Sequence, residues 1–90
     1  MVDIMKILLE KIKRLEELEK TANETEKQYE KEPGNIKYEK AFDAAYKAEF
    51  DAYINAAKYI EYITSGSIDF LTAKKMLQTK RTELLQLLNI

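Results

Sequence analysis

Apolar and polar residues alternate along this chain with the period of an α-helix in three successive segments. The segments are separated by the residues that most readily interrupt a helix, first Pro33 with Gly34 and then Gly66. Glu32-Pro33-Gly34-Asn35 predicts a turn, because the residue before a proline is pushed out of the α region and glycine accepts positive φ. The sequence therefore predicts helices at about 3–31, 35–64 and 68–88.

The predicted fold class is all-α, a three-helix up-down-up antiparallel bundle with long coiled-coil-like helices. The 90 residues suit a single domain spanning 1–90, near the lower end of sizes that are stabilised by burial alone. Apolar residues make up 46% of the chain and charged residues 34%, a composition that suits one buried stripe per helix and a solvated exterior.

The first helix carries a heptad stripe that weakens along its length. Its second core position holds Ile4 and Leu18, but also Lys11 and Thr25. Its first core position is occupied by Met1, Leu8, Leu15, Ala22 and Tyr29. We therefore expect the far half of this helix to be held less tightly.

The second helix places its polar residues on one narrow line, so that most of its circumference should contact protein. The third helix has one apolar face, interrupted by Arg81, and Ser67 is placed to cap its start. The second helix should therefore lie between two neighbours. The polar line comprises Lys40, Asp43, Lys47, Asp51, Lys58 and Glu61, and the face of the third helix comprises Phe70, Ala73, Leu77, Leu84 and Leu88.

Two charged residues stand where a core is expected. Glu49 falls near the centre of the apolar face of the second helix, and Arg81 falls within the stripe of the third. If the two helices are antiparallel with Ile60 near Phe70, the same register opposes Glu49 to Arg81. We therefore predict a partly buried Glu49–Arg81 ion pair that fixes the register of these helices.

A second interpretation of Glu49 stays open. Together with hydroxyls from Tyr38, Tyr46 or Tyr53, its carboxyl group would line a polar pocket that receives a ligand or a proton.

The composition argues against enzymatic function. Without cysteine or histidine, the chain lacks disulfides, the usual zinc ligands and Cys/His or Ser/His nucleophile chemistry. We predict no catalytic residues, no metal, no cofactor and no small-molecule substrate. An apolar run near the roughly 20 residues of a membrane span is also missing. Because Asp3, Lys6 and Glu10 interrupt the first segment, we expect no signal peptide and a cytoplasmic location.

The predicted function is protein–protein interaction, with another protein or with a second copy of the chain as the partner. Apolar residues outside the stripes cluster near both chain ends, and in an up-down-up bundle these clusters lie at opposite ends of the molecule. Tyrosines at the edge of the second helix add a further surface. The candidate interface residues are Val2, Met5, Leu9, Tyr59, Tyr62, Leu85 and Leu87.

The alternative function is nucleic-acid binding through the third helix, the most basic segment of the chain. It carries Lys74, Lys75, Lys80 and Arg81 against Asp69 and Glu83. These basic residues do not form one stripe on the helix surface, so the sequence favours a protein partner.

Overall fold

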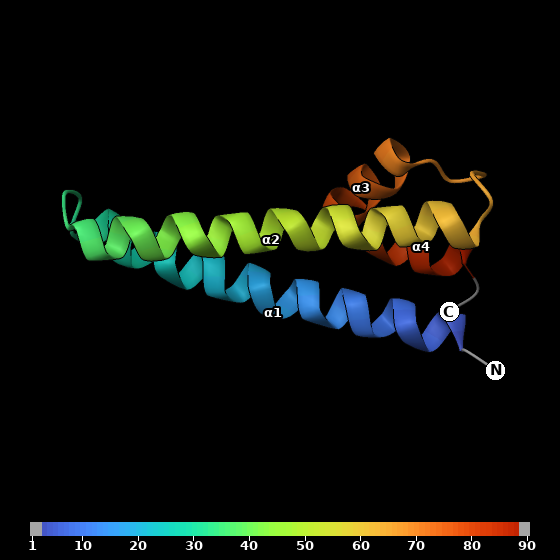
Figure 1. Cartoon of the computed structure of the whole chain (residues 1–90), viewed down its shortest axis with the longest axis horizontal. Coiled ribbons are helices and arrows are strands. Elements are labelled where there is room, and N and C mark those ends of the chain that lie inside the picture. Colours follow the sequence, from blue (N-terminus) through green and yellow to red (C-terminus); the bar gives the residue numbers. More distant parts are fainter. Residues whose placement is uncertain (1–2, 89–90) are drawn as a thin grey trace.

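The computed structural model describes residues 3–88, which fold into four α-helices and no strand (Figure 1). The helices are α1 (Ile4–Lys31), α2 (Ile36–Ile63), α3 (Phe70–Thr79) and α4 (Arg81–Leu87). The all-α class and the first two helices are confirmed. The single helix expected over 68–88 is wrong, because the chain breaks at Lys80 into the short helices α3 and α4.

The two long helices begin at polar caps. The side chain of Asp3 accepts a hydrogen bond from the Lys6 amide at the start of α1, and that of Asn35 accepts from the Lys37 amide at the start of α2. Gly34 adopts φ 103°, a value that its missing side chain allows. The Pro33–Gly34 turn therefore joins α1 to α2 as the sequence predicts.

The connection from α2 to α3 is fixed by side chains from both ends. Ser65 and Gly66 have φ angles of 52° and 83°, which reverse the chain after α2. Asp69 caps α3 by accepting from the Thr72 amide at 2.8 Å, so the cap lies two residues beyond the predicted Ser67. The Glu61 carboxylate accepts from the Phe70 amide at 2.7 Å and ties the start of α3 to α2.

The side chain of Arg81 caps the C-terminal end of α3, where the break at Lys80 leaves a backbone carbonyl without its usual partner. Lys80 has φ −140° and ψ 48°, outside the helical region, so the Leu77 carbonyl loses its usual partner, the backbone amide four residues later. The guanidinium of Arg81 takes its place, donating to the Leu77 oxygen from Nε at 3.1 Å and from Nη2 at 2.8 Å.

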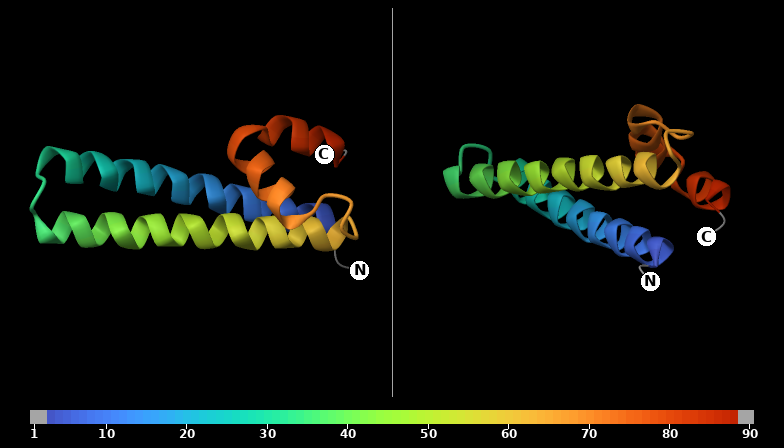
Figure 2. Two further views of the ribbon diagram at one scale, coloured as in Figure 1. Left: turned by 90° about the horizontal axis from the view of Figure 1, so that it is seen from above. Right: turned by 45° about the vertical axis from the view of Figure 1, so that its right-hand side comes forward.

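Helices α1 and α2 form a long antiparallel hairpin that opens away from the Pro33–Gly34 turn (Figure 1). At the open end α3 crosses α2, and α4 then turns back toward the beginning of α1 (Figure 2). The start of α1 and the end of α4 consequently lie at the same end of the molecule. The expectation that they lie at opposite ends is wrong, because it assumed an unbroken third helix.

The core is concentrated at this open end. Its buried residues on α1 are Leu8, Ile12 and Leu15, which pack with residues of α2, α3 and α4. Ile12 is 4% exposed whereas Ile4 is 45% exposed, so the second line of the α1 stripe is shifted by one residue from the predicted heptad. The other members of the core cluster are Tyr53, Ala56, Ala57, Ile60, Ala73, Leu77 and Leu84.

The half of the hairpin near the turn consists of two helices only. In this half α1 contributes a single buried residue, Ala22, as the weakening stripe suggested. Within residues 3–88, no helix is long and apolar enough to cross a membrane.

Candidate functional site

A polar network joins α1, α2 and α4 at the edge of the core. Arg81 Nη1 lies 3.0 Å from Glu19 Oε1, and the Tyr53 hydroxyl donates to Glu19 Oε2 at 2.5 Å. Glu16 lies farther away, 3.9 Å from the same Arg81 nitrogen. The side chains of Arg81 and Glu19 are 23% and 29% exposed, so the charges are shielded from water only in part. Glu19 therefore receives a hydrogen bond on each of its two carboxylate oxygens.

The predicted Glu49–Arg81 ion pair is wrong in its acidic partner. Arg81 is shielded at the edge of the core, as expected, but its guanidinium reaches Glu19 and Glu16 of α1. The predicted register required one straight helix after Gly66, and the break at Lys80 removes that register. Glu19 was missed because the predicted heptad left it outside the core stripe, although it lies four residues after the buried Leu15.

The network shifts the acidities of its members. Partial burial by itself raises the pKa of Glu19, but the hydrogen bonds from Arg81 and Tyr53 and the charge of Arg81 outweigh it and lower the pKa below its usual value. Burial and the hydrogen bond to Glu19 raise the pKa of Tyr53 to about 12. The network thus favours an ionised Glu19 and a protonated Tyr53.

Glu49 is a half-buried carboxylate that lacks an ion pair within residues 3–88. Burial, followed by the charges of Glu19 and Glu26, raises its pKa above the usual value. It lines a cleft of about 50 Å³ with Tyr46, Phe50, Tyr53 and Gln78. Such a volume holds about one or two water molecules. The cleft is too small for an organic ligand, and Tyr38 is not among its lining residues.

A run of aromatic side chains extends from this cleft toward the turn, half-buried at Tyr29 and Phe42 and exposed at Tyr46 and Phe50. We define the aromatic strip as Tyr29, Phe42, Tyr46 and Phe50. The rings of Tyr29 and Phe42 stack at 5.8 Å between centroids, and those of Phe42 and Tyr46 at 6.2 Å. Tyr46 is 59% exposed and Phe50 is 44% exposed. The strip begins at Phe50, next to α3. The Lys74 Nζ of α3 lies 4.8 Å from the centre of the Phe50 ring.

Sequence reasoning did not identify this strip as a surface. The wide apolar face of α2 did predict two neighbours, and a third helix of 21 residues would have covered the whole face. Because the chain breaks at Lys80, α3 and α4 cover the apolar face of α2 only at the open end of the hairpin (Figure 2).

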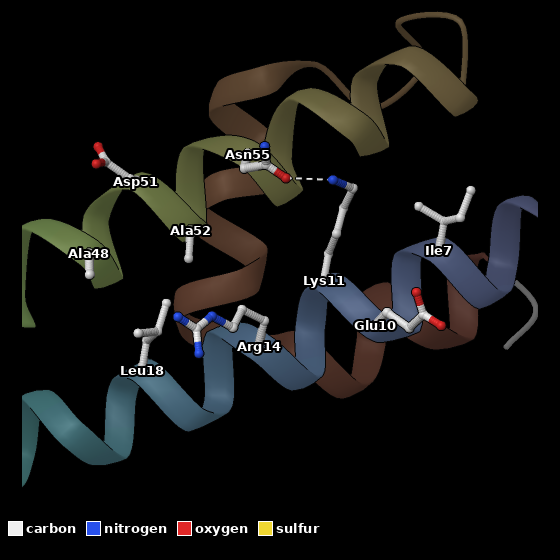
Figure 3. Close-up of a pocket in the computed structure, with 9 residues that line it drawn as sticks. All are labelled: Ile7, Glu10, Lys11, Arg14, Leu18, Ala48, Asp51, Ala52 and Asn55. Atoms are coloured by element: carbon white, nitrogen blue, oxygen red, sulfur yellow. Dashed lines mark hydrogen bonds between the residues drawn. The ribbon is translucent and has the colours of Figure 1, made fainter.

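A groove of about 510 Å³ separates α1 from α2 on the other face of the hairpin, with α3 and α4 lying behind it (Figure 3). Small side chains at Ala48 and Ala52 leave this space open. Lys11 reaches across it, with Nζ 2.6 Å from the Asn55 side-chain oxygen and 5.2 Å from the centre of the Tyr59 ring. The rim carries both signs of charge and shows no preference for one kind of ligand.

The predicted interface residues do not form one surface. Met5 and Leu9 are 38% and 43% exposed and line a shallow depression on α1, together with the aliphatic parts of neighbouring charged residues. Tyr62 and Leu87 are exposed at 78% and 66%. Val2 lies outside the described residues.

Two of the predicted interface residues are used inside the fold. Leu85 is partly buried against the core, because α4 folds back onto it. Tyr59 is also partly buried against the core, and its hydroxyl donates to the Ile4 carbonyl at 3.4 Å. Neither residue is free to contact a partner with its whole side chain.

The basic residues of the third segment do not form one surface, because two of them make contacts within the fold and two are exposed. Arg81 binds Glu19 and the Leu77 carbonyl, while Lys74 covers Phe50. Lys75 and Lys80 are exposed. Among residues 3–88, no group of three or more acidic side chains is arranged to hold a metal ion.

Comparisons of this chain with protein-family models, curated proteins and solved structures found no match.

Proposed function

We propose that this protein is a non-enzymatic protein-binding module that uses the aromatic strip to hold a helical surface of its partner. The observation that carries the proposal is the exposure of Tyr46, which belongs to the stacked aromatic run, and of Phe50, which lies next to α3. Exposed tyrosine and phenylalanine side chains at the edge of a packed core are typical of interaction sites.

The geometry of the strip favours a helix as the bound element. Tyr29 belongs to α1, and the other three residues of the strip follow one another along α2. The last of them, Phe50, lies beside Lys74 of α3, which packs on α2 farther along the helix. A helix added beside the strip would bury its aromatic rings, as the core cluster that includes Leu77 of α3 buries the neighbouring Tyr53. The partner therefore needs an apolar helical face of about two turns or more.

The charges beside the strip favour a basic partner surface. Burial, followed by the charges of Glu19 and Glu26, raises the pKa of Glu49. Neither Glu26 nor Glu49 has an ion pair within residues 3–88. Residues 16–50 carry ten acidic side chains against six lysines. Lysine or arginine on the partner would neutralise this excess and align the two surfaces.

Nucleic-acid binding is supported less well. Of the four basic residues expected to contact phosphates, Arg81 is engaged by Glu19 and Lys74 lies over Phe50. The strip offers stacking surfaces, but the acidic groups beside it repel a phosphate backbone.

Site-specific photo-crosslinking tests the proposal. A photoreactive phenylalanine would replace Tyr46 in one variant and Tyr62 in the control, since both positions are exposed but only Tyr46 belongs to the strip. We expect one saturable protein adduct at position 46, displaced by excess wild-type chain but not by the Tyr46→Glu chain. Equal labelling at both positions, or an adduct that disappears with nuclease, would contradict the proposal.

A further inference from the structure

We propose that the partner of the aromatic strip is a second copy of this chain, and that α3–α4 of each copy covers the strip of the other. This inference rests on the proposed function and names its partner. It predicts an antiparallel dimer with two-fold symmetry.

The shape of the chain is complementary to itself. Helices α3 and α4 form a raised layer on the open end of the hairpin and leave the turn end without that layer (Figure 2). A two-fold rotation about an axis that is parallel to the hairpin face and perpendicular to the long direction turns the two faces toward each other and reverses the long direction. It therefore places the raised layer of each copy against the uncovered half of its partner. The contact closes on itself, as dimer interfaces in most soluble oligomers do.

The outer surface of α3 has side chains suited to this contact. Ala73 and Leu77 face the core, whereas Leu71 and Lys75 share the opposite side at helical spacing and are exposed. Leu71 is 73% exposed, unusually high for a leucine beside a core. Packing of this leucine on the partner's aromatic rings would remove both apolar surfaces from water.

The charges of the two surfaces are opposite. Glu49 lines a cleft with Tyr46 and Phe50, and Glu26 precedes Tyr29 by about one turn of α1. By contrast, α3 and the following turn expose Lys75 and Lys80. Residues 64–88 carry four basic and two acidic side chains, in contrast to the acidic excess of residues 16–50. A strip facing another strip would bring like charges together, whereas a strip facing α3 brings opposite charges together. The charge pattern thus selects the interlocked arrangement over a strip-to-strip dimer.

Light scattering coupled to size exclusion tests the dimer with the full chain. We expect a mass of twice 10.5 kDa at micromolar concentrations, and dissociation as the salt concentration rises, because the contact is partly ionic. A wild-type chain that stays monomeric under these conditions would overturn the inference. It would leave the proposed function intact if the probe at Tyr46 still formed its specific adduct with another protein.

Charge reversal then tests the arrangement. The strip variant Glu26→Lys/Glu49→Lys and the α3 variant Lys75→Glu/Lys80→Glu should each dimerise at least about tenfold more weakly than wild type. Mixing the two variants should restore a dimer, because opposite charges then meet at both contacts, whereas each variant alone brings like charges together at both. The matched control Glu10→Lys/Asp51→Lys makes the same charge change in the groove on the other face and should dimerise like wild type.

Circular dichroism establishes that every variant is helical, and the exposed substitution Tyr46→Glu gives a second way to disrupt the strip. A strip variant that dimerises like wild type would contradict the inference. Loss of dimer on Tyr46→Glu, with no effect of either charge reversal, would replace the interlocked arrangement by a strip-to-strip contact.

Discussion

Arg81 Nη1 lies 3.0 Å from Glu19 Oε1, although the two residues are 62 positions apart in the chain. The guanidinium forms no ion pair with Glu49, the partner that the predicted helical register suggested. It also caps α3 by donating hydrogen bonds to the Leu77 carbonyl. A single side chain therefore closes a helix end and joins the last part of the chain to the first helix.

Breaking this contact should destabilise the fold. Because both side chains are largely shielded, we expect Arg81→Met to lower the free energy of unfolding by about 1–3 kcal/mol. Chemical denaturation of the single variants and of Glu19→Gln/Arg81→Met measures the coupling between the residues, which should be about 0.5–2 kcal/mol. The Glu49→Gln/Arg81→Met pair is the control. A larger coupling to Glu49 than to Glu19 would contradict the assignment.

The two glutamates should respond to pH in opposite directions. Glu19 has a lowered pKa in the folded state, so its stabilising effect is present above the usual carboxyl range and is lost as the pH falls through that lowered pKa. Glu49 has a raised pKa, so folding is favoured most when it is protonated and less as the pH rises through that pKa.

Thermal unfolding at several pH values measures this difference. At pH 7, Glu19→Gln should lower Tm, whereas Glu49→Gln should leave it unchanged or raise it slightly. Both differences should shrink as the pH falls below about 4, where the unfolded carboxylates become protonated. A lower Tm for Glu49→Gln at pH 7 would show that its carboxylate is paired.

The position of α4 can be tested with two leucines on the same short helix. Leu84 is fully buried whereas Leu87 is 66% exposed. Leu84→Ala should cost about 2–5 kcal/mol of unfolding free energy, because it removes a core side chain and leaves a cavity. Leu87→Ala should change stability by less than about 0.5 kcal/mol in the monomer. Similar losses for both would mean that α4 is not docked as described.

Hydrogen exchange should divide the hairpin into two halves. Amides of α1 and α2 at the open end, around Leu15 and Ile60, are backed by the core, whereas those around Tyr29 and Phe42 belong to a two-helix layer. We expect protection near the turn to be weaker by about tenfold or more, since local opening there exposes less buried surface. Under conditions where the chain dimerises, the difference should decrease.

The helix boundaries near Pro33 and Gly66 could be predicted because each depends on the local geometry of one or two residues. The break at Lys80 could not, since neither glycine nor proline marks it. There the substitute for the backbone hydrogen bond comes from the Arg81 side chain, whose position depends on Glu19 in a distant helix. The aromatic residues were correctly assigned to a wide apolar face, but their exposure depends on where α3 ends.

The shared location of the start of α1 and the end of α4 has a practical consequence for attaching this molecule to a surface. Both lie opposite the Pro33–Gly34 turn along the 47 Å long axis (Figure 1). A tether at either end would therefore project the turn and the neighbouring half of the hairpin outward, away from the support. Coupling through Lys31, next to the turn, would invert the molecule and crowd that half against the support.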